Sequence, residues 1–200
     1  MSEGVVKEKL FKEKKFSFLL IAFTSGVILN VLFNKFGYST QLLVAAVFAY
    51  LLLILAAIDF ETQMLPDIIT KPLIALGLLQ GYFGIFTDFK SALLGAVAGY
   101  FILWSVNFVF RKIRGIDGMG YGDFKLLSAI CAWTGIKMLP LIILCSSIIG
   151  IFVALIIIKL TKSNMQTPTP FGPSLVFTGF IAFIYGNDIL VWYLNLLQIN

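Results

Sequence analysis

The chain has 200 residues, of which 60% are hydrophobic and 12% are charged, and its formal net charge is +5. Soluble globular domains carry about 25% charged residues, so this composition excludes that class and indicates an integral membrane protein. We interpret the positive charge as a sign of topology and of attraction to anionic lipid. No basic patch is interleaved with exposed aromatic residues, so we expect no nucleic-acid partner.

Runs of about 20 apolar residues mark helices that can cross a bilayer. Residues 1–15 form a basic tail, and no cleavable signal peptide fits this start of the chain. We predict an all-α integral membrane protein that forms one domain over residues 1–200, a bundle of about seven helices. The predicted helices span residues 16–33, 41–58, 68–86, 91–110, 124–136, 139–158 and 171–194.

The distribution of Lys and Arg residues predicts the orientation of this bundle in the membrane. With a cytoplasmic N-terminus, 12 of the 15 basic residues fall on the cytoplasmic side and 3 on the other. The positive-inside rule therefore predicts this topology. It also places five acidic residues in two loops that face the cytoplasm: Asp59, Glu61, Asp67, Asp117 and Asp123.

Several chemistries are excluded by residue type. The chain has no histidine, so a Ser/His/Asp triad and a His-ligated metal are impossible. Cys131 and Cys145 lie inside apolar runs and are interpreted as small buried side chains. A Ser/Lys dyad stays open, although the serines within helices have no evident buried lysine partner. We expect no metal and no organic cofactor.

Paired carboxylates also remain, and the sequence favours them over a Ser/Lys dyad. Two close aspartates share a proton, so one can act as base on a water molecule while the other acts as acid. In the stretch "GMGYGDFKLL", glycines such as Gly120 and Gly122 leave room beside Asp123 for an extended substrate strand. The alternative is that Asp123 merely caps the next helix, which is a common role for aspartate. That helix has only about 13 apolar residues, too few to span a bilayer.

A second acidic stretch is "AAIDFETQMLPDIITKP". Asp59 directly follows an apolar run, at a helix end where the helix dipole opposes its charge. We expect Asp67, after Pro66, to cap the helix that begins at Ile68, and Glu61 to be a solvated loop charge. Asp59 is thus the acid of this stretch that calls for a functional explanation.

Three stretches together resemble the type IV prepilin peptidases, the GxGD-type membrane aspartic proteases. They are "IDFETQMLPDIIT", "GMGYGDFKLLSAICAWTG" and "TPFGPSLVFTGFIAFIYGNDILVWYL", and the likeness extends from about Phe16 to Leu197. The resemblance implies that Asp59 and Asp123 are the catalytic pair. It also implies that Pro66 and Asp67 belong to a supporting motif, and that Gly120 and Gly122 position Asp123.

The same resemblance implies the substrate and the location. Substrates would be prepilins or pseudopilins, each with a short basic leader, a glycine before the cut and a hydrophobic helix after it. The protein would be a multi-pass inner-membrane protein whose active site faces the cytoplasm. We expect the proline-rich stretch 166–173 either to pack near the pair or to be a stiff connector.

The bifunctional members of this family begin with a further membrane segment and a cytoplasmic region, often with two CxxC pairs. These are not found in residues 1–200, so we expect no N-methyltransferase activity from this chain. Three alternatives stay open: another GxGD intramembrane protease, a small proton-coupled or ion-coupled transporter, and an assembly subunit without catalysis. The oligomeric state and the particular substrate are not predicted.

Overall fold

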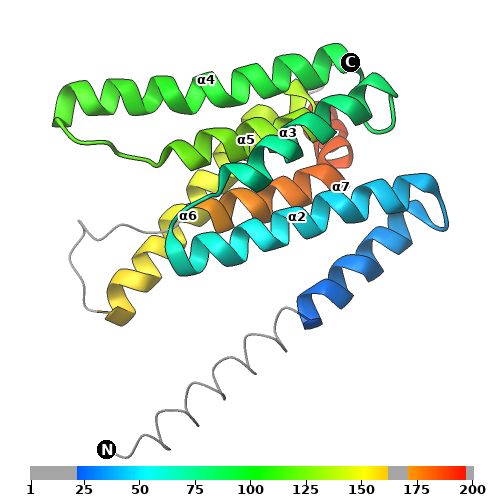
Figure 1. Cartoon of the computed structure of the whole chain (residues 1–200), viewed down its shortest axis with the longest axis horizontal. Coiled ribbons are helices and arrows are strands. Elements are labelled where there is room, and N and C mark those ends of the chain that lie inside the picture. Colours follow the sequence, from blue (N-terminus) through cyan, green and yellow to red (C-terminus); the bar gives the residue numbers. More distant parts are fainter. Residues whose placement is uncertain (1–21, 162–170, 197–200) are drawn as a thin grey trace, which may run out of the picture. The chain divides into compact units, whose positions relative to one another are not determined.

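The computed structural model describes residues 22–161 and 171–196, and within these ranges the secondary structure is helical. This confirms the predicted all-α class. Figure 1 shows the helices in chain order. Their bounds are α2 Thr40–Thr62, α3 Asp67–Tyr82, α4 Phe89–Arg114, α5 Tyr121–Thr134, the short 3₁₀ helix η1 Ile136–Met138, α6 Leu139–Thr161 and α7 Gly172–Leu196.

The chain divides into two compact units, Met1–Tyr50 and Leu51–Asn200. In the first unit, a helix over residues 22–36 ends at Gly37, whose φ of +57° suits a residue without Cβ. The N–H of Gly37 donates to the carbonyl of Phe33 at 2.8 Å. The predicted start of this helix, at residue 16, lies outside the described residues. That the chain forms one domain stays a prediction.

The other six predicted helices match α2 to α7, and no end differs by more than four residues. Four described helical segments are long and apolar enough to cross a membrane, namely Thr40–Thr62, Phe89–Arg114, Ile136–Lys159 and Gly172–Leu196. The predicted shortness of the helix after the glycine-rich loop is confirmed, since α5 has 14 residues. At 1.5 Å per residue that is about 21 Å, less than the roughly 30 Å of a hydrocarbon core.

Helix α5 is the core of the second unit and packs against α3, α4 and α7. Every residue from Phe124 to Trp133 except Lys125 is buried. Its neighbours approach closely through glycines: a Cβ on Gly95 of α4 would lie 2.5 Å from the carbonyl oxygen of Cys131. A Cβ on Gly179 of α7 would lie 2.7 Å from Ile130. Small residues at helix contacts are typical of membrane bundles, where backbones must approach to gain packing.

Buried polar side chains fix α3 to the far end of α5. The indole N–H of Trp133 donates to the carbonyl of Leu73 at 2.9 Å. The amide of Gln80 donates to the carbonyl of Ala132 at 3.2 Å and accepts from the N–H of Phe86 at 3.1 Å. These bonds satisfy groups that would be costly to leave unpaired in an apolar interior. The C-terminal half of α5 is therefore rigidly held, independently of the loop that precedes it.

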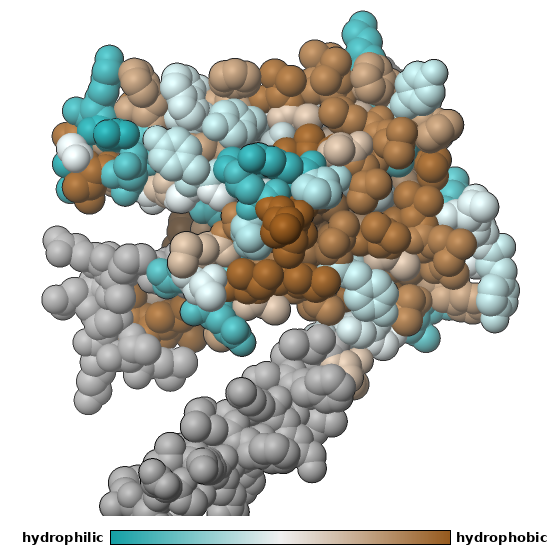
Figure 2. Space-filling view, in the orientation of Figure 1, coloured by the Kyte–Doolittle hydropathy of each residue, from teal (hydrophilic) through white to brown (hydrophobic). Residues whose placement is uncertain are grey.

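The outer helices expose large apolar side chains. On α6, for example, Leu144, Ile151 and Phe152 are each more than 60% exposed. Figure 2 shows apolar side chains over much of the visible face, with a smaller polar area among them. Such a surface suits lipid contact and agrees with a membrane protein.

Candidate active site

Asp59 lies in the last turns of α2 and is buried, with 4% of its surface exposed. The helix continues four residues beyond the predicted end at residue 58, so Asp59 lies within α2 and not after its last residue. Its Oδ2 accepts a hydrogen bond from the backbone N–H of Gly172 at 3.0 Å. Gly172 is the first residue of α7, so the positive end of that helix offsets the unfavourable end of α2.

Asp123 lies in the first turn of α5 and is also buried, with 8% exposed. The alternative that it merely caps this helix was wrong, because α5 begins at Tyr121 and its N-cap is Gly120. The backbone N–H of Asp123 donates to the carbonyl of Gly120 at 3.1 Å, and the backbone of Gly120 also interacts with the Asp123 carboxyl. Burial, and to a smaller extent the charge of Asp59, raise the pKa of Asp123 from 3.8 to about 7.

The influence of Asp59 on Asp123 means that the fold brings these two carboxyls into one electrostatic environment. They come from helices separated by α3 and α4 in the chain. Lys125, two residues after Asp123, forms an ion pair with Asp67 and not with Asp123, and Arg111 approaches Asp117. Two buried carboxyls under these conditions hold one proton between them, which is the state that acid and base catalysis requires.

The two glycines of the sequence prediction differ in their surroundings. A Cβ on Gly122 would lie 2.8 Å from Cβ of Leu65, a residue of the loop between α2 and α3. A Cβ on Gly120 would meet nothing closer than 3.9 Å, the distance to Oδ2 of Asp123. Gly122 is therefore needed for the packing of the two site loops, whereas the space beside Gly120 is open toward the carboxyl.

Asp67 has a structural role beside the pair. Its predicted capping role was wrong, because Asp67 is the first residue of α3 and Pro66, in an extended conformation, is the N-cap. The Asp67 carboxylate forms ion pairs with Lys71 at 2.9 Å and with Lys125 of α5. The hydrogen bonds from these two lysines lower the pKa of Asp67 below its usual value, so it stays ionised. Glu61 is exposed as expected, although it lies in α2 and not in a loop.

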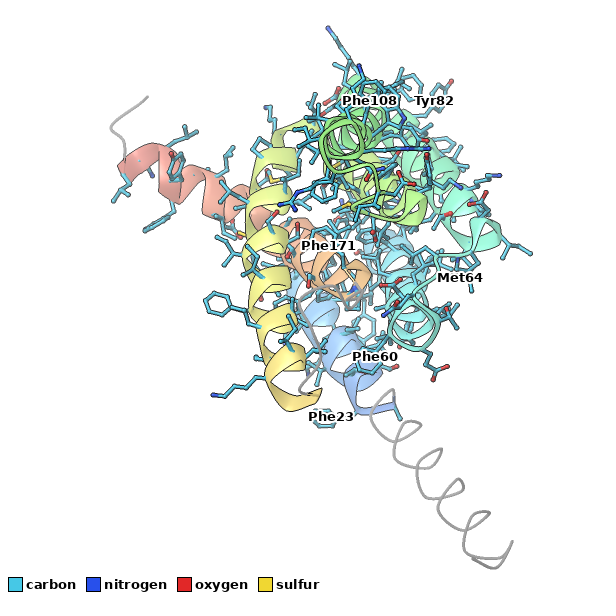
Figure 3. All side chains as sticks on the ribbon, turned by 90° about the vertical axis from the view of Figure 1, so that its left-hand side faces the viewer. Phe23, Phe60, Met64, Tyr82, Phe108 and Phe171 are labelled. Atoms are coloured by element: carbon cyan, nitrogen blue, oxygen red, sulfur yellow. The ribbon has the colours of Figure 1, made fainter. Side chains whose placement is uncertain are left out.

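The proline-rich stretch 166–173 contributes to the site through its described end. Gly172 bonds to Asp59, and a Cβ on Gly172 would lie only 2.5 Å from Oδ2 of that residue. Phe171 packs its ring against α6, where a Cβ on Gly150 would lie 2.9 Å away (Figure 3). Of the two alternatives given for this stretch, the contact of Gly172 with Asp59 favours packing near the pair, while residues 166–170 lie outside the described part. The role of Gly172 was not predicted, because a backbone donor has no side-chain signature.

A second residue that sequence reasoning missed is Asn107 of α4. Its side chain is buried and bonds to the loop that leads to Asp123, through Asp117, Gly118 and Met119. The signal that could have found it is a single carboxamide in an otherwise apolar run, since such groups are costly in a membrane unless they have partners.

No group of three or more Cys, Asp or Glu side chains suitable for a metal occurs within residues 22–161 and 171–196. Cys131 is buried in α5 and Cys145 is half-buried in α6.

Comparisons with known proteins show the family of this chain. The model of the type IV leader peptidase family matches residues 46–155, a range that includes Asp59 and Asp123. The chain belongs to this family. The match confirms the resemblance inferred from the three sequence stretches.

Relatives named "Prepilin leader peptidase/N-methyltransferase" match most of the chain. The protein from Stutzerimonas stutzeri is 40% identical over 176 residues, which are 88% of this chain and 61% of that protein. The Pseudomonas aeruginosa protein is 43% identical over 80% of this chain and 55% of its own length. The Aeromonas hydrophila protein is 43% identical over 80% and 54%. The chain thus spans a little over half the length of these relatives, and no solved structure matches it.

Proposed function

We propose that this chain is a membrane aspartic endopeptidase that removes the short basic leader of type IV prepilins or pseudopilins. The observation that carries the proposal is the pair of buried aspartates, Asp59 and Asp123, within the region matched by the leader peptidase family. The names of the relatives, which specify prepilin leader peptidase activity, support the substrate class.

The chemistry follows from the shared proton. One carboxylate takes a proton from a water molecule, whose oxygen attacks the scissile carbonyl carbon. The carboxyl group of the other aspartate donates its proton to the carbonyl oxygen, which gives a tetrahedral gem-diol. The proton taken from water then passes to the amide nitrogen as the C–N bond breaks, and one hydroxyl proton of the gem-diol returns to the second aspartate. Burial of Asp123 favours this residue as the protonated member, and the hydrogen bond from the N–H of Gly172 favours the carboxylate form of Asp59. The two residues titrate together, so these roles describe the resting pair.

We place the site at the cytoplasmic face of the inner membrane. Supporting this, the last turn of α4 carries Arg111, Lys112 and Arg114, directly before the loop that leads to Asp123. Lys71 and Lys125 add further positive charge around the two site loops. By the positive-inside rule these residues belong in the cytoplasm. A substrate anchored by its apolar helix would present its leader at this boundary.

The alternatives are less well supported. A transporter usually places its acids within the middle of membrane helices, whereas Asp59 and Asp123 lie in the last turns of α2 and the first turn of α5. An assembly subunit needs no buried pair of acids. Another type of GxGD intramembrane protease would share the pair, but the family match favours the leader peptidases.

The test is cleavage of a purified prepilin in liposomes, followed by mass spectrometry of the product. The proposal predicts a single cut after the glycine that precedes the apolar helix. The matched control is the same prepilin with that glycine replaced by a bulky residue. A chelator, added in parallel, should leave the rate unchanged, and a wild-type protein that cuts neither substrate would refute the proposal.

A further inference from the structure

Asn107 is a buried polar residue in the apolar helix α4, with 5% of its surface exposed. The next residue, Phe108, is exposed and lies on the outer side of the helix (Figure 3). A carboxamide inside a membrane helix is costly unless its donors and acceptors are satisfied. The partners of Asn107 therefore explain why it is tolerated there.

Those partners all belong to the loop between α4 and α5. The side-chain oxygen of Asn107 accepts the N–H groups of Gly118 at 2.9 Å and of Met119 at 3.2 Å. Its side-chain nitrogen donates to Oδ1 of Asp117 at 3.2 Å. Because two successive backbone donors converge on one oxygen, the direction of the loop backbone is fixed relative to α4.

The loop has little freedom beyond these bonds. At its start, Gly115 ends α4 with a φ of +74°, which reverses the chain direction. Gly118 approaches the ring of Phe110 so closely that a Cβ would lie 2.7 Å from it. Only residues 120–122 separate Met119 from Asp123, whose N–H donates to the carbonyl of Gly120. A displacement of the loop at Met119 would therefore be passed to the carboxyl of Asp123.

We propose that Asn107 is a positioning residue of the leader peptidase reaction, which holds the loop 115–120 so that Asp123 is presented correctly to Asp59. This inference rests on the proposed function. Asn107 does not touch the reacting atoms, and it acts through the backbone of the loop. The later turns of α5 pack against α3, α4 and α7 without help from Asn107. Loss of the hydrogen bonds of Asn107 is therefore expected to disturb the first turn of α5 and to leave the bundle folded.

A reciprocal exchange of Asn107 and Asp117 tests the proposal. Asn107→Asp keeps an oxygen that can accept both backbone N–H groups, but it sets a second carboxylate against Asp117. Asp117→Asn is the matched control, since its amide oxygen still accepts from Asn107. In the double variant the amide at position 117 donates to the carboxylate at position 107, so the three bonds of position 107 are restored with the roles reversed, while Arg111 loses its ion-pair partner at position 117.

We expect kcat for prepilin cleavage to fall roughly 10- to 100-fold in Asn107→Asp, as is typical when a catalytic group is slightly misplaced, with KM little changed. Asp117→Asn should stay near wild type, and the double variant should recover most of the lost kcat. A normal kcat in Asn107→Asp would overturn the proposal. So would a double variant that is no better than Asn107→Asp.

A measurement that does not need cleavage separates this proposal from the proposed function. The infrared band of the protonated Asp123 carboxyl, assigned by its loss in Asp123→Asn, should titrate near pH 7 in the wild type. In Asn107→Ala we expect this midpoint to move to lower pH, because a loosened first turn admits water to the carboxyl. An unchanged midpoint would overturn the positioning role. A shifted midpoint in a protein that cleaves no prepilin would support that role and refute the proposed function alone.

Discussion

The backbone N–H of Gly172 donates to Oδ2 of Asp59 at 3.0 Å, although the two residues are 113 positions apart in the chain. This bond connects the start of α7 to the last turns of α2 inside the second unit. It satisfies a carboxylate that has 4% of its surface exposed and that the dipole of its own helix disfavours. The catalytic role proposed for Asp59 therefore depends on a residue that has no side chain.

Replacing Gly172 by Ala should reduce cleavage strongly, because the new Cβ would lie 2.5 Å from Oδ2 and 2.8 Å from Cγ of Asp59. We expect kcat to fall by roughly 100-fold, since a displacement of about 1 Å of a reacting group has this scale of effect. Melting curves of a double-mutant cycle check the cause. In an Asp59→Ala background the methyl group has no carboxyl to displace, so Gly172→Ala should cost less stability there than in the wild type. Equal costs in both backgrounds would contradict the contact.

The two glycines before Asp123 should respond differently to alanine. Gly122→Ala places a methyl 2.8 Å from Cβ of Leu65, so we expect a lower melting temperature and lower activity. Gly120→Ala meets no atom closer than 3.9 Å and should leave the melting temperature near that of the wild type. Thermal unfolding of both variants in the same detergent makes the comparison. A larger loss of stability in Gly120→Ala would contradict the packing described for the two loops.

The raised pKa of Asp123 should make stability depend on pH. The unfolded chain loses this proton near pH 3.8, while the folded chain keeps it up to about pH 7. The folded state therefore becomes less stable as the pH rises through this interval. Asp123→Asn removes this titration, so the variant should melt at a higher temperature than the wild type at about pH 8, with a smaller difference at about pH 5. A difference that is constant with pH would show that Asp123 does not titrate in this range.

Asp67→Asn should have a small effect. The ion pairs of Asp67 with Lys71 and Lys125 are partly exposed, since 43% of the Asp67 side chain is accessible. Exposed pairs contribute about 0–1 kcal/mol, so we expect the variant to fold and to keep most of its activity. Cleavage rate and melting temperature, measured beside Asp123→Asn, provide the check. Complete loss of activity in a well-folded Asp67→Asn protein would assign this residue a catalytic role.

Much of this fold could be predicted from the sequence because membrane helices carry a simple signal. Long apolar runs, interrupted by charges and glycines, located α2 to α7 to within four residues at each end. The predicted helix ends were less accurate than the predicted helices themselves. Helix α2 continues through Asp59 to Thr62, and α4 continues through its basic residues to Arg114. A helix does not stop where its side chains become polar, so hydropathy alone misplaced both ends.

The pair of aspartates was predictable for a different reason. Once other chemistries are excluded, Asp59 and Asp123 are acids at membrane boundaries whose placement needs an explanation. The roles of Gly172 and Asn107 were not predictable in this way. They act through a backbone amide and through a contact between a helix and its following loop, and neither leaves a periodic pattern in the sequence.

We propose that Asp59 and Asp123 together perform the cleavage. The most direct measurement is the cleavage rate of a purified prepilin in liposomes by the wild type, Asp59→Asn and Asp123→Asn, with folding of each variant checked by its melting curve. We predict that each substitution abolishes cleavage while the protein stays folded, because a neutral amide can neither take nor supply the proton. A well-folded variant of either residue that cuts at near the wild-type rate would contradict the two-aspartate mechanism.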